Sequence, residues 1–137
     1  MTMESYEPAK IGIAEIDEQH EEFFMQLSLL RVALIDGIQG QTKVNDTLHY
    51  LETFVQEHFE TEERLMALHQ YPYLQHHRQE HANFVQTIAA IRQRALEAGS
   101  DSSAVIAVEI EQRLGQWLLG HIATVDRMMG EFLEGKI

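Results

Sequence analysis

Apolar residues recur at intervals of three and four positions through four long segments of the chain. This spacing places them on one face of an α-helix, so the pattern predicts helices over about residues 13–37, 42–70, 73–98 and 102–133. Residues that end or begin helices separate these segments: the glycine-containing stretches 37–40 and 99–102, and Pro72 between them. No strand-like alternation of useful length is present, which leaves an all-α protein.

The fourth predicted helix carries a stripe of residues that we expect to face the interior. Its members are Ile110, Leu114, Trp117, His121, Val125, Met128 and Phe132. The predicted connections between successive helices are short, and short connections make neighbouring helices antiparallel. The sequence therefore predicts one domain over residues 1–137, an up-down-up-down antiparallel four-helix bundle with an N-terminal arm of about residues 1–12.

Polar residues interrupt all four apolar stripes. Donors four residues apart project from the same face of a helix, so such pairs can converge on one metal region. Asp126 is harder to place, because five residues turn it about 140° from His121 on an ideal helix. It can share the site only if the helix distorts locally or the metal lies at the helix edge. The candidate donors are His20, His58, Glu62, His77, His81, His121 and Asp126.

A single histidine on such a stripe is most simply a hydrogen-bonded core residue. Five imidazoles and a glutamate inside one small bundle are harder to satisfy, because each buried polar group without a partner costs about 1–3 kcal/mol. Seven nitrogen and oxygen donors suit two ions bridged by carboxylates, which leaves the metal open among iron, zinc, manganese and nickel. We expect the other histidines, His49, His69 and His76, to be non-ligands.

The composition narrows the class of protein further. The 137 residues are 45% hydrophobic and 23% charged, and ten basic against 22 acidic side chains give a net charge of −12. That balance argues against nucleic acid and against a membrane surface as partners. The sequence has no cysteine, no signal-peptide pattern and no apolar run long enough to cross a bilayer, so we expect a cytoplasmic protein.

Four motifs in this chain resemble those of the hemerythrin family in its single-domain bacterial form. They are Ile16-Asp17-Glu18-Gln19-His20, His58-Phe59-Glu60-Thr61-Glu62, His77-Arg78-Gln79-Glu80-His81, and the run WLLGHIATVD from Trp117 to Asp126. The resemblance implies two iron ions bridged by the carboxylates of Glu62 and Asp126 and by an oxo or hydroxo group. It assigns His77, His81 and His121 to one iron, and His20 and His58 to the other, whose open position would bind dioxygen.

The resemblance also implies an apolar ligand pocket beside the irons. Its expected lining residues are Phe23, Phe59, Trp117, Leu118 and Ile122, although plain core packing would explain the same residues. The chain departs from the family at Gly120, where a bulkier polar residue is common. We expect that glycine to allow a closer helix contact or a more open route to the site.

The leading functional interpretation is a non-enzymatic protein that binds dioxygen reversibly, as a carrier, store or scavenger. A di-iron enzyme acting on peroxide or nitric oxide would use the same ligands. A third interpretation is an oxygen or redox sensor that works through a partner protein. A zinc-stabilised bundle is the fourth.

Overall fold

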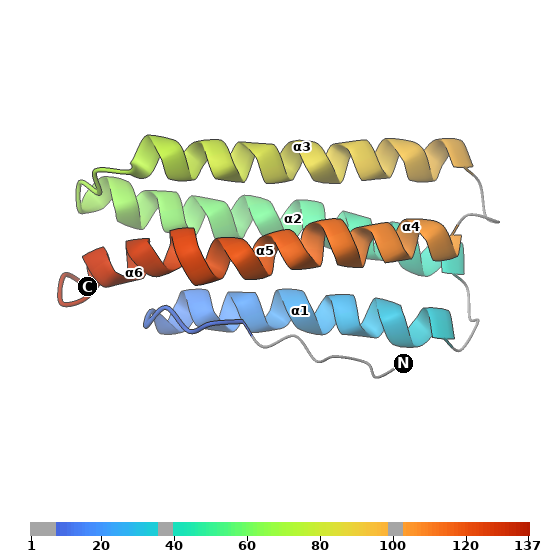
Figure 1. The fold of residues 1–137 in the computed structure, drawn as a ribbon, viewed down its shortest axis with the longest axis horizontal. Helices are drawn as coiled ribbons and strands as arrows, with labels where there is room; N and C mark the ends of the chain where they lie inside the picture. Colours follow the sequence, from blue (N-terminus) through green and yellow to red (C-terminus); the bar gives the residue numbers. More distant parts are fainter. Residues whose placement is uncertain (1–7, 36–39, 99–102) are drawn as a thin grey trace.

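The computed structural model describes residues 8–35, 40–98 and 103–137, and these residues form four long helices and no strand. The first three are α1 (Ala14–Ile35), α2 (Gly40–Leu68) and α3 (Leu74–Ala98). The helices lie side by side, and successive helices run in opposite directions (Figure 1). The predicted all-α four-helix bundle is confirmed.

The fourth helix is a composite of α-helical and π-helical segments. Its α-helical parts are α4 (Ser103–Glu109), α5 (Gln116–His121) and α6 (Arg127–Leu133). Two π-helical segments join them, η2 (Ile110–Gly115) and η3 (Ile122–Asp126). A π-helix bonds each carbonyl to the N–H five residues on, so each such segment advances the helix by one residue relative to an α-helix.

The turn between α2 and α3 is short and closely bonded. Gln70 takes a left-handed backbone conformation, with φ of 57°, that ends α2, and the N–H of Tyr71 donates to the carbonyl of Met66 at 2.9 Å. Pro72 follows and cannot continue the helix. Of the predicted break at 37–40, residues 37–39 lie outside the described residues and Gly40 begins α2, and the break at 99–102 also lies outside them.

The described part of the N-terminal arm packs against the start of α1 and against α6. The carboxylate of Asp17 accepts from the backbone N–H of Ile11 at 2.9 Å and of Gly12 at 3.3 Å. Gly12 has φ of 90°, a conformation that favours glycine. Gly130 lets the arm approach closely, because a Cβ there would lie 2.4 Å from the carbonyl oxygen of Ile11.

The predicted stripes form the interior, with one departure. In the first three helices the described members of each stripe are buried or half-buried. In the fourth helix Met128 was expected inside, but its side chain is 52% exposed, whereas Met129 is fully buried. The π-helical η3 causes this shift, because it moves every later residue one position round the helix. Within the described ranges, no helix is both long and apolar enough to cross a membrane.

Candidate metal centre

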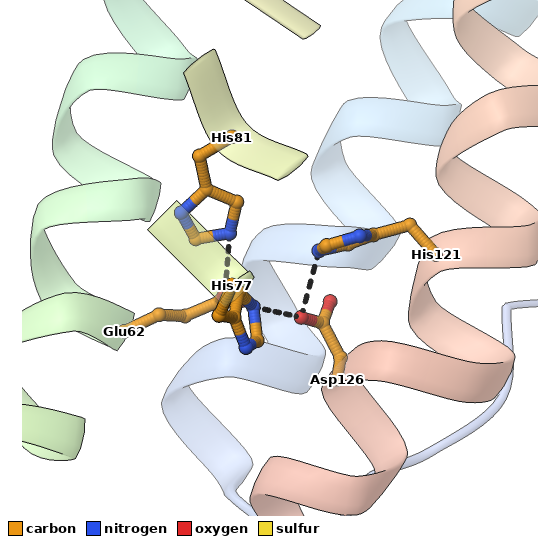
Figure 2. A group of neighbouring side chains, drawn as sticks. All are labelled: Glu62, His77, His81, His121 and Asp126. Atoms are coloured by element: carbon orange, nitrogen blue, oxygen red, sulfur yellow. Dashed lines mark hydrogen bonds and ion pairs between the residues drawn. The ribbon is translucent and has the colours of Figure 1, made fainter. Parts of the chain in front are cut away.

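The bundle brings the seven candidate donors together at its centre. Each is at most 4% exposed. They come from every helix: His20 from α1, His58 and Glu62 from α2, His77 and His81 from α3, and His121 and Asp126 from α5 and η3. Figure 2 shows five of them, with His77 and His121 directed at the carboxylate of Asp126 and with Glu62 reaching in from α2 behind His77.

The donors form two groups that share both carboxylates. One group is Glu62, His77, His81, His121 and Asp126, and the other is His20, His58, Glu62 and Asp126. In each group, one possible ligand atom per residue lies within 4.8 Å of all the others. The arrangement therefore offers two neighbouring metal positions, one with five protein donors and one with four.

Glu62 faces both positions, one with each oxygen. Its Oε1 lies 3.2 Å from Nε2 of His77 and 3.1 Å from Nε2 of His81. Its Oε2 lies 2.8 Å from Nε2 of His58 and 3.6 Å from Nε2 of His20. This is the geometry that a carboxylate needs to bridge two ions.

Asp126 divides its oxygens in the same way. Its Oδ1 is 2.9 Å from Nε2 of His77 and 3.0 Å from Nε2 of His121, and its Oδ2 is 3.3 Å from Nε2 of His20. The backbone N–H of Arg127 bonds to the carbonyl of Ile122, five residues back, as a π-helix requires. That local distortion turns Asp126 to the same side as His121, which an ideal α-helix would not do.

The charges in the cluster are strongly coupled. Burial lowers the pKa of His20, but the close contacts and the negative charges of the Asp126 and Glu62 carboxylates outweigh it and raise that pKa to about 9. His77 follows the same balance, and its pKa is also raised to about 9. Burial works to raise the pKa values of Glu62 and Asp126, yet the surrounding histidines hold both well below their usual range. The metal-free cluster thus favours protons on His20 and His77 and negative charge on its two carboxylates.

Hydrogen bonds alone do not satisfy this cluster. Among its buried atoms without a hydrogen-bond partner are Nε2 of His81, Nε2 of His121, Oε2 of Glu62 and both carboxylate oxygens of Asp126. Several neighbouring donor atoms in the cluster, such as Nε2 of His121 and Oδ1 of Asp126 at 3.0 Å or Nε2 of His81 and Oε1 of Glu62 at 3.1 Å, are about as far apart as two donors that each lie about 2.1 Å from one ion. The donor set therefore fits two metal ions that prefer nitrogen and oxygen ligands.

Aromatic rings stack on three of the candidate histidine ligands. Phe59 lies parallel to His81, with ring centroids 3.7 Å apart, and Trp117 lies nearly parallel to His121 at 4.5 Å. Phe54 stacks on His58 at 5.3 Å. Stacking restricts the orientation of each imidazole and covers one of its faces with an apolar surface.

The residues expected to line a pocket are placed unequally. Phe59 and Trp117 contact candidate ligands, and Phe84, which the sequence did not single out, joins them, with centroids 5.9 Å from Phe59 and 4.5 Å from Trp117. Phe23 packs 6.1 Å from Phe84. Leu118 and Ile122 are buried in the hydrophobic core.

Three polar residues that the sequence analysis missed reach the outer ring nitrogens of candidate ligands. Oε1 of Gln19 lies 2.7 Å from Nδ1 of His58, and Oε2 of Glu63 lies 2.9 Å from Nδ1 of His81. Oε1 of Glu80 lies 3.5 Å from Nδ1 of His121. Each of the three is next to a candidate ligand in the sequence, but it contacts a different candidate ligand on another helix. The sequence alone does not reveal that contact.

Gly120 does not make the closer helix contact that was one of its two expected roles. It is exposed, and a Cβ built on it would meet nothing within 4 Å. His49 and His76 are exposed and His69 is half-buried, and none of the three belongs to either donor group.

Comparison with known proteins places the chain in a family. Residues 11–133 match the sequence model described as Hemerythrin HHE cation binding domain. The chain belongs to the hemerythrin family. Membership implies non-haem iron, and the histidine and carboxylate cluster described above is able to hold a metal.

The relatives that the chain resembles include bacteriohemerythrins and a myohemerythrin. The chain is 32% identical to a bacteriohemerythrin of Stenotrophomonas maltophilia over 117 residues, which cover 85% of this chain and 72% of that protein. It is 27% identical to a bacteriohemerythrin of Ralstonia nicotianae over 93% of this chain and 85% of that protein. It is 26% identical to the myohemerythrin of Theromyzon tessulatum over 80% and 85% respectively. No solved structure gives a significant match to the chain.

Proposed function

We propose that this chain binds dioxygen reversibly at a non-haem di-iron centre held by the seven clustered residues. One observation carries the proposal: the seven donors form a group of five and a group of four, and the two groups share the carboxylates of Glu62 and Asp126. The five-donor group would hold one ion and the four-donor group the other. The ion with fewer protein donors would have more room for an exogenous ligand.

The assignment of ligands follows the two groups. His77, His81 and His121 would hold the five-donor iron, and His20 and His58 the four-donor iron, with Glu62 and Asp126 bridging. When bound, the two ferrous ions would supply two electrons to dioxygen and recover them on its release.

The protein's own contribution is to hold and cover the centre. The Nε2 atoms of the five histidines point toward the centre of the cluster. A histidine binds metal through the lone pair of a neutral ring, so His20 and His77, whose pKa values are raised in the metal-free chain, must each release a proton when metal binds. Phe59 and Trp117 cover the rings of His81 and His121. Water and stray protons are thereby excluded from one side of the centre, which favours reversible binding over loss of a reduced oxygen species.

The test is to reduce the purified protein without oxygen, count its iron and follow its visible spectrum through repeated oxygenation. Two irons per chain and a charge-transfer band that appears under oxygen and disappears on its removal would support the proposal. Two irons that pass directly to a stable oxidised form would favour a redox enzyme or a sensor instead. Zinc in place of iron would indicate a structural bundle.

A further inference from the structure

The two metal positions differ in what stands behind their histidines. In the five-donor group, Nδ1 of His81 faces the carboxylate of Glu63 at 2.9 Å, and Nδ1 of His121 faces that of Glu80 at 3.5 Å. In the four-donor group, Nδ1 of His58 faces the neutral amide oxygen of Gln19 at 2.7 Å. The five-donor position therefore has negatively charged residues next to its histidines, whereas His58 of the four-donor position has a neutral amide next to it.

The remaining histidines do not reduce this difference. Nδ1 of His20 and Nδ1 of His77 are buried and have no hydrogen-bond partner among the residues that the structure describes. One of these rings belongs to each group. Within the described part of the chain, Nδ1 of His121 also has no hydrogen-bond partner, because Glu80 lies 3.5 Å away, so the contrast between the positions rests chiefly on Glu63 against Gln19.

Glu63 is itself held in place. Its Oε2 faces His81, while its Oε1 accepts from Nε of Arg78 at 3.2 Å. Arg78 lies on α3 one residue after His77, so the arginine and His81 grip the carboxylate from the same helix. The glutamate side chain is only half-buried, yet its position relative to His81 is defined by both contacts.

The acceptor at the outer nitrogen decides how a histidine ligand behaves. Any acceptor fixes the tautomer, with the proton on Nδ1 and the lone pair on Nε2. A carboxylate acceptor also draws that proton toward itself, which makes the ring a stronger donor and stabilises higher charge on the metal. An amide oxygen orients the ring without adding charge.

We propose that Glu63 and Gln19 are positioning residues that make the two metal positions electronically unequal. Glu63 makes the five-donor position electron-rich, and Gln19 orients His58 while leaving the four-donor position electron-poor. This inference rests on the proposed di-iron centre. It adds that the four-donor position, which would take the exogenous ligand, is the electron-poor one of the two.

Gln19 is a neutral residue in a pocket that carboxylates also line. Gln19 and His58 line an open pocket of about 180 Å³ together with Glu22 and Glu57. The chain has 22 acidic side chains and a net charge of −12, and two of these acidic residues line this pocket. The residue that contacts the imidazole is nevertheless an amide.

The experiment measures stepwise zinc affinities of the metal-free protein and midpoint potentials of the iron-loaded protein. Four variants are compared with the parent: Glu63→Gln, Gln19→Glu, Gln19→Met, and the double variant Glu63→Gln with Gln19→Met. Glu60→Gln and Gln79→Glu are matched controls, because they change the charge equally at exposed positions next to the candidate ligands of α2 and α3. Zinc is redox-inert, so its affinity reports on the ligands without any oxygen chemistry.

We expect Glu63→Gln to weaken one zinc-binding step about 10- to 100-fold and Gln19→Met to weaken the other by a similar factor. The double variant should show both losses, and the controls should stay within about twofold of the parent. Gln19→Glu should lower one midpoint potential well beyond the shift that Gln79→Glu causes, and Glu63→Gln should raise the other.

Equal shifts from Gln19→Glu and Gln79→Glu would overturn the inference, because net charge alone would then explain them. Unchanged zinc affinities in Glu63→Gln and Gln19→Met would overturn it as well. A parent chain that fails to bind two ions would instead refute the proposed di-iron centre, so the two failures are distinguishable.

Discussion

His121 and Asp126 are five residues apart in the sequence, and Nε2 of the first lies 3.0 Å from Oδ1 of the second. The π-helical η3 between them makes this contact possible, because its hydrogen bonds span five residues rather than four. The same distortion turns Met129 into the core and Met128 out of it. One local change in helix geometry therefore places a carboxylate in the cluster and resets the packing of α6.

Replacing Asp126 with Asn should remove one bridge between the two metal positions. An amide is neutral and a weaker donor, so we expect the number of tightly bound ions to fall from two to one, with the weaker step losing more than about tenfold in affinity. Zinc titration against a chelating dye, with metal analysis after dialysis, would measure this. Asp46→Asn, at an exposed position of α2, is the control. Two ions held with parental affinity would contradict the bridging role.

The metal-free chain should lose stability as the pH rises from about 6.5 to 9. His20 and His77 have pKa values of about 9 when folded, against 6.5 when exposed, so the folded state holds more protons across that range. Their contribution is complete below pH 6.5 and disappears as the pH passes 9. Thermal unfolding in the presence of a chelator would measure the trend.

Acid should destabilise the metal-free chain for the opposite reason. The pKa values of Glu62 and Asp126 are lowered in the folded state, so their contribution is present above about pH 4 and is lost as the pH falls through the folded values.

The zinc-loaded chain is the control for the expected loss of stability between pH 6.5 and 9, because its histidines are neutral donors and have no proton to lose. A melting temperature of the metal-free chain that stays level or rises between pH 6.5 and 9 would contradict this account.

The fluorescence of Trp117 should report on the metal position beside it. Trp117 is the only tryptophan in the sequence, and its ring stacks on His121 with centroids 4.5 Å apart. We expect iron binding to quench the emission by more than half, and redox-inert zinc to change it far less. The variant His121→Ala should lose the iron response at low metal concentration. Equal quenching by iron in that variant and in the parent would show that the signal does not come through His121.

Two glycines of the fourth helix should respond in opposite ways to the same substitution. Gly120→Ala meets open space, so it should stabilise the chain by about 0.5–1 kcal/mol through helix propensity alone. Gly130→Ala would place a Cβ 2.4 Å from the carbonyl oxygen of Ile11, so it should destabilise the chain by displacing the arm. Denaturant unfolding of both variants measures the difference. A stabilising Gly130→Ala would show that the arm does not depend on this contact.

The sequence predicts most of this fold because three of the helices are regular. A spacing of three and four gives the correct interior positions wherever the backbone keeps 3.6 residues per turn, as it does around Phe23, Leu48 and Ile88. The pattern failed at Met128 because hydrophobic spacing does not reveal a π-helical segment. The five-residue step from His121 to Asp126 was the one sign of it.

The residues around the candidate site were predicted less completely than the candidate donors. Phe84 was not singled out, since an aromatic residue at an apolar position gives no sign of what it contacts. Gln19 and Glu63 were missed because they are half-buried polar residues at helix edges, where a sequence pattern resembles that of a solvated face. Their partners are on other helices, and only the packing of the bundle brings them together.

The distribution of donors over the helices also sets the order in which a functional molecule can be made. The five-donor group draws on α2, α3 and the fourth helix, and the four-donor group on α1, α2 and the fourth helix. Both positions include donors from the fourth helix, so neither is complete in a newly made chain until the last part of the sequence has packed against the earlier helices. A complete metal position therefore forms only together with the packing of the fourth helix against the earlier ones, so metal binding and the final packing of the bundle stabilise each other.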